Sequence, residues 1–219
     1  MENKIRIAID GPSGAGKSTI AKLVAKQLGI DYIDTGAMYR AIGYKMIKNQ
    51  VKIDEKEKLT ELLANTEIDF VSGNIVLDGE IVNDKIRTPE ISKMASDSSA
   101  LQEVREKLVA LQRKMGQTKS VVMDGRDIGT NVLTDAEYKF FMTASSAERA
   151  KRRWLELSQK GEAVDLEQVE ADIIQRDYND STRKLNPLRK AEDAMELDTT
   201  GLSIEEVTGK ILEVVKWQS

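Results

Sequence analysis

The residues with the most distinctive chemistry form a glycine-rich turn that ends in lysine and serine, Gly11-Pro12-Ser13-Gly14-Ala15-Gly16-Lys17-Ser18. The turn fits the phosphate-loop pattern of a glycine, four residues and then Gly-Lys-Ser/Thr. Its glycines let successive backbone N–H groups point at phosphate oxygens, Lys17 supplies a cation for the outer phosphates, and the Ser18 hydroxyl can hold Mg²⁺. A glycine-rich turn with an incidental lysine is the alternative interpretation.

The flanking residues predict the strand and the helix that a phosphate loop requires. Apolar residues alternate in 5–9, which is typical of a buried strand, and recur at helical spacing in 20–28. Gly29 then ends the helix as a C-cap would. This setting favours the phosphate-binding interpretation, with the triphosphate at the amino end of the helix.

Clusters of arginine and aspartate form a second group of candidates. Asp124-Gly125-Arg126-Asp127 follows an apolar run at 121–123, and ligands of open α/β sheets gather beyond the carboxyl ends of such strands. Arg176, Asp180 and Arg183 have the i, i+4, i+7 spacing of one helix stripe. The first block also fits an ordinary Asp-Gly turn, and the second fits a row of surface salt bridges, so spacing alone leaves both open.

Two further sets of basic residues are equally open to a structural interpretation. Arg40 lies about one helical turn after Thr35, where it also fits a solvated helix face. A basic run, Arg149 to Arg153, crowds the start of a predicted helix, and Arg149 and Arg153 share one face of it at i, i+4. Such a run is usually solvated, and it can also resemble a nucleic-acid-binding patch.

The elements that must position these residues predict an α/β fold. Apolar runs at 31–34, 121–123, 138–142 and 195–198 join the first strand as five candidates for a parallel sheet. Long helical segments connect most of them, as parallel crossovers require. Further helices are expected at 147–160, 166–183 and 203–216, the last with a capping box of Ser203 and Glu206.

The strongest shift in composition marks an insertion at about residues 65–87. Short strands at 68–71, 74–77 and 80–82 are separated by Ser72-Gly73 and Asp78-Gly79, the turn chemistry of consecutive hairpins. We therefore predict a small three-stranded antiparallel sheet apart from the main one.

The amino-acid composition limits the partners and the catalytic groups that this chain can use. The chain has 219 residues with a net charge of −4, so nothing attracts a nucleic-acid backbone or an anionic membrane globally. It contains neither cysteine nor histidine, which excludes thiol nucleophiles, disulfides and histidine bases together. Phosphoryl transfer survives this exclusion because it depends on positioning and charge neutralisation. With no signal peptide or long apolar run, we expect a cytoplasmic protein.

Four blocks of residues, in this order, give the chain its resemblance to a known family. They are the phosphate loop, Asp34–Arg40, Met123–Thr130, and Asn186–Ala191 followed by Leu197–Thr200. Together with the insertion they make the whole chain similar to the bacterial cytidylate kinases, a branch of the nucleoside-monophosphate kinases. The resemblance implies a phosphate-loop NTPase-type fold: a five-stranded parallel sheet flanked by helices, the three-stranded insertion and a helical lid.

The resemblance also divides the single kinase unit of residues 1–219. It implies a core at about 1–34, 106–147 and 184–219, a monophosphate-binding region at about 35–105, and a lid at about 148–165. The implied activity is transfer of the γ-phosphoryl group of ATP-Mg²⁺ to CMP and dCMP, giving CDP or dCDP and ADP, in pyrimidine nucleotide metabolism.

Each role in that reaction is implied for particular residues. ATP is bound by Gly11, Pro12, Ser13, Gly14, Ala15, Gly16, Lys17, Ser18 and Thr19, with Ser18 as the Mg²⁺ ligand. The acceptor nucleotide is bound by Thr35, Arg40, Ser96, Arg105, Asp124, Arg126, Asp127, Arg176, Asp180 and Arg183. Catalysis falls to Lys17, Arg126, Arg183 and the lid residues Arg149 and Arg153.

Choice of base is the sharpest question, and the resemblance assigns it to Ser96, Arg105 and Asp127. Cytosine offers an amino donor where uracil offers a carbonyl acceptor, so a carboxylate or hydroxyl there accepts from cytosine and opposes uracil. A buried mismatch of that kind discriminates by ~10⁴ or more. Ser96 lies in a serine-rich run, so the reading serine could lie two positions away, and Asn179 replaces an arginine of some members on the ribose side.

Three alternatives stay open at this point. A kinase for UMP or for a metabolite hydroxyl would share the phosphate loop. A regulatory GTPase would need an Asn-Lys-x-Asp stretch, which the sequence lacks. A nucleic-acid-binding protein would use the basic run at 149–153. We expect a monomer without nucleic-acid or membrane partners.

Overall fold

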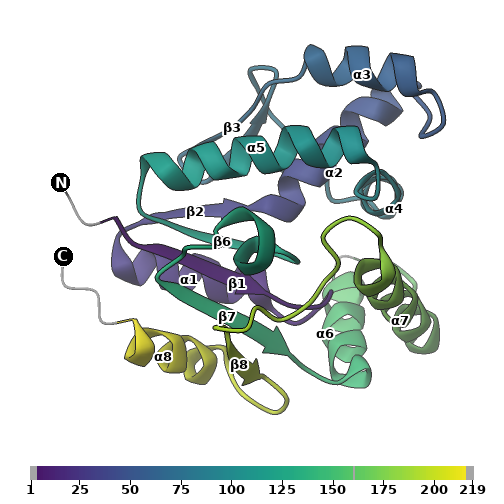
Figure 1. The fold of residues 1–219 in the computed structure, drawn as a ribbon. Coiled ribbons are helices and arrows are strands. Elements are labelled where there is room, and N and C mark those ends of the chain that lie inside the picture. The colour runs from purple at the N-terminus through teal and green to yellow at the C-terminus, as the bar shows by residue number, and fades with distance from the viewer. Residues whose placement is uncertain (1–3, 160, 216–219) are drawn as a thin grey trace. The chain divides into compact units, whose positions relative to one another are not determined.

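A computed structural model describes residues 4–159 and 161–215 (Figure 1). By its internal contacts the chain forms two compact units. Unit 1 comprises Met1–Tyr32 and Lys119–Ser219, and unit 2 comprises Ile33–Thr118. Each unit is described by itself.

The main sheet is parallel and five-stranded, as the apolar runs predict. Its strands are β1 (Arg6–Asp10), β2 (Asp31–Asp34), β6 (Val121–Gly125), β7 (Tyr138–Thr143) and β8 (Met195–Asp198). Their order is β2-β6-β1-β7-β8, which places β1 in the middle, paired with β6 on one side and β7 on the other. Asp10 lies opposite Gly125 in this register, so the loops that leave β1 and β6 begin side by side.

Helices of unit 1 cover the sheet and pack on one another. They are α1 (Lys17–Leu28), α6 (Ser146–Gln159), α7 (Leu166–Thr182) and α8 (Ile204–Val214), with a π-helical turn, η1 (Ile128–Val132), between β6 and β7. Helix α1 lies along the sheet (Figure 1) and shares a buried core with α8, in which Ile9, Val24 and Ile211 meet. A second buried cluster, around Ala150 and Ile173, joins α6 to α7.

Unit 2 combines four helices with a second sheet. The helices are α2 (Thr35–Lys48), α3 (Lys56–Ala64), α4 (Pro89–Ser98) and α5 (Gln102–Thr118). The antiparallel strands are β3 (Ile68–Val71), β4 (Asn74–Leu77) and β5 (Glu80–Ile81), in that order, which confirms the three-stranded insertion. Helix α4 ends at Ser98, and the hydroxyl of the next residue, Ser99, donates to the Ser96 carbonyl and so competes with the helix backbone.

Contact between α2 and α4 is close because Gly43 lacks a side chain. A Cβ at Gly43 would lie 3.0 Å from the Ala95 backbone nitrogen, a contact so tight that the backbone of α4 would have to move. Asp34 fixes the start of α2, since its Oδ1 accepts the Ala37 N–H at 2.8 Å as an N-cap. These two features set where α2 and α4 present their polar residues.

None of the helices in residues 4–159 and 161–215 combines the length and the apolar character that a membrane span requires.

Candidate active site

The phosphate loop connects β1 to α1, as the motif predicts. Gly11 begins it with a φ of +149°, and a Cβ there would lie 2.1 Å from the Met142 carbonyl oxygen of β7. Only glycine satisfies both constraints. Helix α1 then starts at Lys17, so its first N–H groups face the loop.

Lys17 is buried inside this loop. Its Nζ donates to the Pro12 carbonyl at 2.7 Å, which folds the side chain back over the loop backbone. Burial lowers the pKa of Lys17 to about 7, and the positive charge of Arg126 adds to the effect. An anion placed against this ammonium would favour its charged form, so the loop is electrostatically suited to a phosphate.

Arg149 and Asp177 hold the loop from the side of α6 and α7. Arg149 Nη1 donates to the Ser13 carbonyl at 2.9 Å and forms an ion pair with Asp177 at 2.6 Å. Asp177 Oδ1 in turn accepts the Ser13 N–H at 3.3 Å, so both polar groups of that residue's backbone are engaged. Arg149, which the sequence assigns to a lid, is thus buried against the phosphate loop itself. Asp177 was not among the predicted residues.

The other basic residues of α6 point elsewhere. Arg153 forms an ion pair with Glu156 one turn along the same helix, at the surface. Arg152 donates to the Thr199 carbonyl at 2.8 Å and so binds α6 to the segment after β8. Of the run at 149–153, Arg149 is the one basic residue that is buried; the solvated interpretation suits Arg153 in this arrangement.

Ser18 and Asp124 place oxygen donors next to the loop. The Ser18 hydroxyl donates to Asp124 Oδ2 at 2.9 Å, and the Tyr32 hydroxyl donates to Asp124 Oδ1 at 2.7 Å. Asp124 is buried at the end of β6. A hydroxyl and a carboxylate are the hard oxygen ligands that Mg²⁺ prefers, so these residues fit that ion beside a bound triphosphate. Tyr32 was missed by the sequence reasoning, because only the sheet order brings β2 alongside β6.

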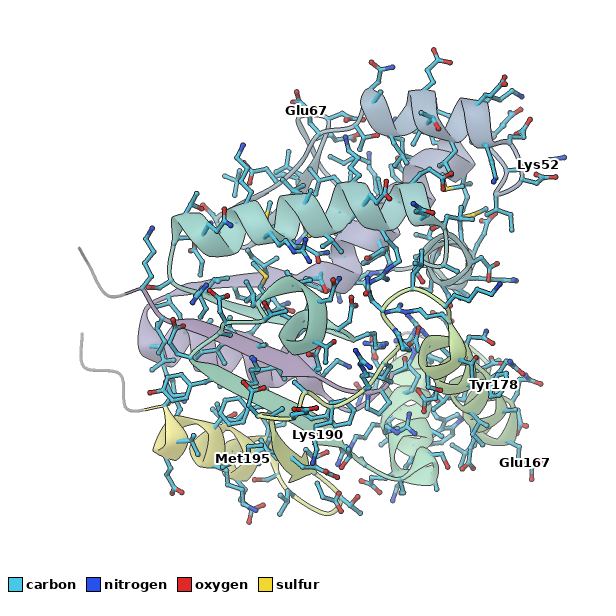
Figure 2. All side chains as sticks on the ribbon, in the orientation of Figure 1. Lys52, Glu67, Glu167, Tyr178, Lys190 and Met195 are labelled. Carbon is cyan, nitrogen blue, oxygen red and sulfur yellow. The ribbon has the colours of Figure 1, made fainter. Side chains whose placement is uncertain are left out.

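A buried network of alternating charge lies beyond the carboxyl end of β6. Arg126 Nε donates to Asp180 Oδ2 at 2.8 Å, and Arg183 Nη2 donates to Asp127 Oδ1 at 3.0 Å. Arg183 also lies 3.9 Å from Asp180, which joins the two pairs. The predicted residues of the β6 loop and of the α7 stripe are therefore together. Tyr178, on another side of α7, points outward instead (Figure 2).

The network favours the ionised forms of Asp180 and Arg126. Burial by itself raises the pKa of the Asp180 carboxyl, but the charges of Arg126, Arg176 and Arg183 outweigh it and hold that pKa below its ordinary value. Burial likewise lowers the pKa of Arg126, and the carboxylates led by Asp180 more than reverse this. The result is a set of fixed, desolvated guanidinium groups, the kind of site that binds phosphate.

The turn after α7 orients Arg183. Its Nε donates to the Asn186 carbonyl at 2.8 Å, and Asn186 adopts a left-handed φ of +48° that asparagine tolerates. The Leu188 N–H donates to the Asp180 carbonyl at 2.8 Å and closes the turn. The Asn-Pro-Leu block thus has a structural role, because it fixes the guanidinium plane of Arg183.

Unit 2 also presents an arginine that is oriented by a carboxylate. Arg40 Nη2 donates to Asp34 Oδ2 at 3.0 Å, the same carboxylate that caps α2, so the cap and the arginine share one anchor. The Arg40 Nε is buried and finds no hydrogen-bond acceptor within the described part of the chain. A buried donor of this kind favours an external acceptor, such as a phosphate oxygen. Thr35 is buried beside it at the start of α2.

Helices α4 and α5 place the predicted base-reading residues of unit 2. The guanidinium of Arg105 lies 5.9 Å from the centre of the Tyr39 ring, a cation–π distance, and Nη1 donates weakly to the Ser99 carbonyl at 3.4 Å. Ser98 is fully buried and its hydroxyl faces the Ala95 carbonyl, whereas Ser96 keeps part of its surface exposed. Of the two serines, Ser96 is therefore the better placed to meet a ligand.

Comparison with known proteins agrees with these features. The family described as "Cytidylate kinase" matches residues 7–217. A cytidylate kinase of Caldicellulosiruptor saccharolyticus is 58% identical over 96% of this chain and 95% of its own length. The cytidylate kinase of Bacillus velezensis is 53% identical over 100% of this chain and 100% of its own length. That of Clostridioides difficile is 51% identical over 95% of this chain and 97% of its own length.

One solved structure supports the fold alone. An uncharacterized protein from Eubacterium ventriosum has a TM-score of 0.55 at 16% identity and covers 97% of this chain and 98% of its own. The family match and the relatives, by contrast, span nearly the whole sequence, including the phosphate loop and the arginine–aspartate network. The chain therefore belongs to the cytidylate kinase family.

Proposed function

We propose that this chain transfers the γ-phosphoryl group of ATP to CMP, and also to dCMP, giving CDP or dCDP and ADP. The observation that carries the proposal is the placement, at the ends of the adjacent strands β1 and β6, of a phosphate loop and a desolvated arginine–aspartate network. Two phosphate-binding arrays on neighbouring strands suit a reaction between two phosphates. Membership of the cytidylate kinase family supports cytosine as the base.

On the donor side, the residues of the phosphate loop and Thr19 bind ATP through the loop amides and Lys17. Ser18, with Asp124 behind it, would hold the Mg²⁺ ion that accompanies ATP. When bound, the ion supplies positive charge to the phosphates. Arg149 fixes the loop backbone at Ser13, and we assign the neutralisation of charge in the transition state to Lys17, Arg149 and Arg153.

On the acceptor side, Arg126 and Arg183 of unit 1 and Arg40 of unit 2 bind the CMP phosphate. Their carboxylate partners orient them before substrate arrives, so little reorganisation is needed during the reaction. Arg176 and Asp180 bind the ribose hydroxyls. We assign the segment near 148–165, of which residue 160 lies outside the described residues, to a lid that excludes water, since water would otherwise compete as acceptor.

Base selection rests on two acceptors and one donor. Ser96 and Asp127 accept from the cytosine amino group, and Arg105 donates to the ring acceptors. Asp127 accepts from Arg183 and from Asn131 at 3.0 Å each, which holds its carboxylate in place for the base. Uracil would present its carbonyl to these acceptors, and the mismatch would be buried.

A panel of acceptors tests the proposal. The initial rate with ATP and Mg²⁺ is measured for CMP, dCMP, UMP, AMP and GMP, using detection of ADP. We expect CMP and dCMP to exceed UMP by a large factor, and Lys17→Ala to abolish turnover. A UMP rate equal to the CMP rate would remove the base-reading assignment, and Lys17→Ala activity within a few-fold of the parent would remove the mechanism.

The same proposal includes a monomeric enzyme. Sedimentation velocity at assay concentrations measures this directly. Retention on DNA at physiological salt, the signature of the basic-run alternative, is expected to be absent.

A further inference from the structure

Asp10, the last residue of β1, connects the two neighbouring loops of unit 1. Its side chain is buried, with 4% of the residue exposed. Oδ1 accepts the Ile128 N–H at 2.8 Å, and Oδ2 accepts the Gly129 N–H at 2.7 Å. These are the first residues of η1, the turn that follows Arg126 and Asp127 in the chain. One carboxylate thus reaches from the strand that begins the phosphate loop to the loop that carries Arg126.

The turn is also confined on its other side by Lys139 of β7. A Cβ at Gly129 would lie 3.2 Å from Lys139 Cδ and 3.4 Å from Asp10 Oδ2, tight contacts that a side chain could make only by displacing these neighbours slightly. Lys139 is itself held, because its Nζ donates to the Thr134 carbonyl and to Asp193, each at 2.6 Å. The backbone at Gly129 is therefore fixed between the Asp10 carboxylate and the stem of a buried lysine.

Core packing does not explain this carboxylate. Burial raises the pKa of Asp10 to about 6, with the two N–H bonds opposing the shift. Above that pH the carboxyl is ionised and both of its oxygens accept hydrogen bonds. Burying this charge in the protein interior costs free energy. A neutral residue would suit the core better, so the carboxylate must act here as an acceptor with two oxygens, which an apolar side chain cannot replace.

We propose that Asp10 is a positioning residue for the phosphoryl acceptor: it fixes the backbone at 128–129 and thereby the orientation of Arg126 and Asp127 toward CMP. The inference rests on the assignment of Arg126 to the CMP phosphate made above. Asp10 touches neither nucleotide; it acts through the turn.

The test compares Asp10→Asn with the parent at pH 7.5. The amide oxygen of asparagine can accept one N–H, while its NH₂ group faces the other as donor against donor. We expect hydrogen exchange to accelerate at the amides of 128 and 129, and KM for CMP to rise roughly tenfold, the worth of one charge-assisted bond. The increase in KM for ATP should be at least fivefold smaller than the increase in KM for CMP. Gly129→Ala, which presses on the same carboxylate from the turn, should act in the same direction.

Two control variants distinguish positioning from a general loss of stability and from a wrong acceptor assignment. Val207→Ala removes buried volume from α8 in the same unit and should lower stability without changing KM for CMP. Arg126→Ala tests the acceptor assignment by itself. If Arg126→Ala raises KM for CMP and neither Asp10→Asn nor Gly129→Ala does, the positioning role is wrong and the proposed function stands.

The remaining outcomes are equally decisive. If Arg126→Ala leaves KM for CMP unchanged, the acceptor assignment fails, and the positioning role fails with it. Equal increases of KM for CMP and for ATP in Asp10→Asn would overturn selective positioning. If Asp10→Asn does not fold, the result with Gly129→Ala decides by the same criteria.

Discussion

Binding of ATP should take up a proton at Lys17. The lysine has a pKa of about 7 in the structure, because it is buried and close to Arg126. The phosphates of ATP bring several negative charges next to Nζ and should return the pKa toward its ordinary value near 10.5. ATP should therefore bind preferentially to the form of the enzyme in which Lys17 is protonated, and deprotonation of Lys17 should weaken binding.

The size of the effect follows from the pKa. About half of the unliganded enzyme has a neutral Lys17 at pH 7, about nine-tenths at pH 8 and about one-tenth at pH 6. We thus expect uptake of about 0.9 proton per ATP at pH 8, and a Kd that weakens up to roughly tenfold per pH unit between pH 7 and 9. The full shift of the Lys17 pKa, from about 7 to 10.5, corresponds to roughly 5 kcal/mol of interaction between the ammonium and the phosphates.

Isothermal titration calorimetry measures the uptake directly. A non-hydrolysable ATP analogue is titrated at pH 8 with Mg²⁺ in buffers of different ionisation enthalpy, and the slope of observed enthalpy against that enthalpy gives the number of protons. Lys17→Arg is the matched control, because arginine stays charged and should show no uptake. A parent protein that takes up no proton at pH 8 would refute the reasoning about burial of Lys17.

Three further predictions concern other parts of the molecule. Asp180→Asn leaves Arg126 and Arg183 without their shared carboxylate; we expect stability to fall by roughly 3–5 kcal/mol in chemical denaturation and KM for CMP to rise with little change for ATP. Asp10 has a folded pKa of about 6 against 3.8 when unfolded, so its contribution to stability is complete below pH 4 and is lost as pH rises through 6, a change of about 3 kcal/mol. The difference in unfolding free energy between the parent and Asp10→Asn should follow that curve, with Asp127 and Lys17 as the neighbouring charges; a flat difference from pH 4 to 7 would contradict it. Gly43→Ala should force α4 away from α2, costing about 1–3 kcal/mol and weakening CMP binding measured by calorimetry. Gly209→Ala, inside α8 with open space around it, should instead raise stability by about 0.5–1 kcal/mol and leave CMP binding unchanged.

Local patterns identified much of the site because the chemistry requires fixed spacing. Contiguous residues form the phosphate loop, so its motif is visible without any knowledge of the fold. The same holds for the β6 loop, which continues directly from its strand, and for Arg176 and Asp180, which lie one turn apart on α7. Arg183 follows directly after α7 ends at Thr182, with an extended backbone in place of the predicted helical one. Family resemblance, rather than spacing, assigned these residues to an acceptor nucleotide.

Other partners were invisible in the sequence because they are distant along the chain. Asp177 reaches Ser13 only after α6 and α7 have packed, and Tyr32 reaches Asp124 only because β2 lies next to β6. Arg149 illustrates the difference: its helix and basic neighbours were predictable, yet its contact with the phosphate loop was not.

By itself, the sequence determined the elements, their parallel arrangement, the three-stranded insertion and the reactive motifs, since these depend on periodicity and on short-range turn chemistry. Tertiary structure alone decided which carboxylate holds which arginine and how Asp10 reaches the turn after β6. Those pairings are chosen by sheet order and helix packing, which bring together side chains 54 and 56 residues apart in the two arginine–aspartate pairs and groups more than a hundred residues apart in the contacts of Asp10.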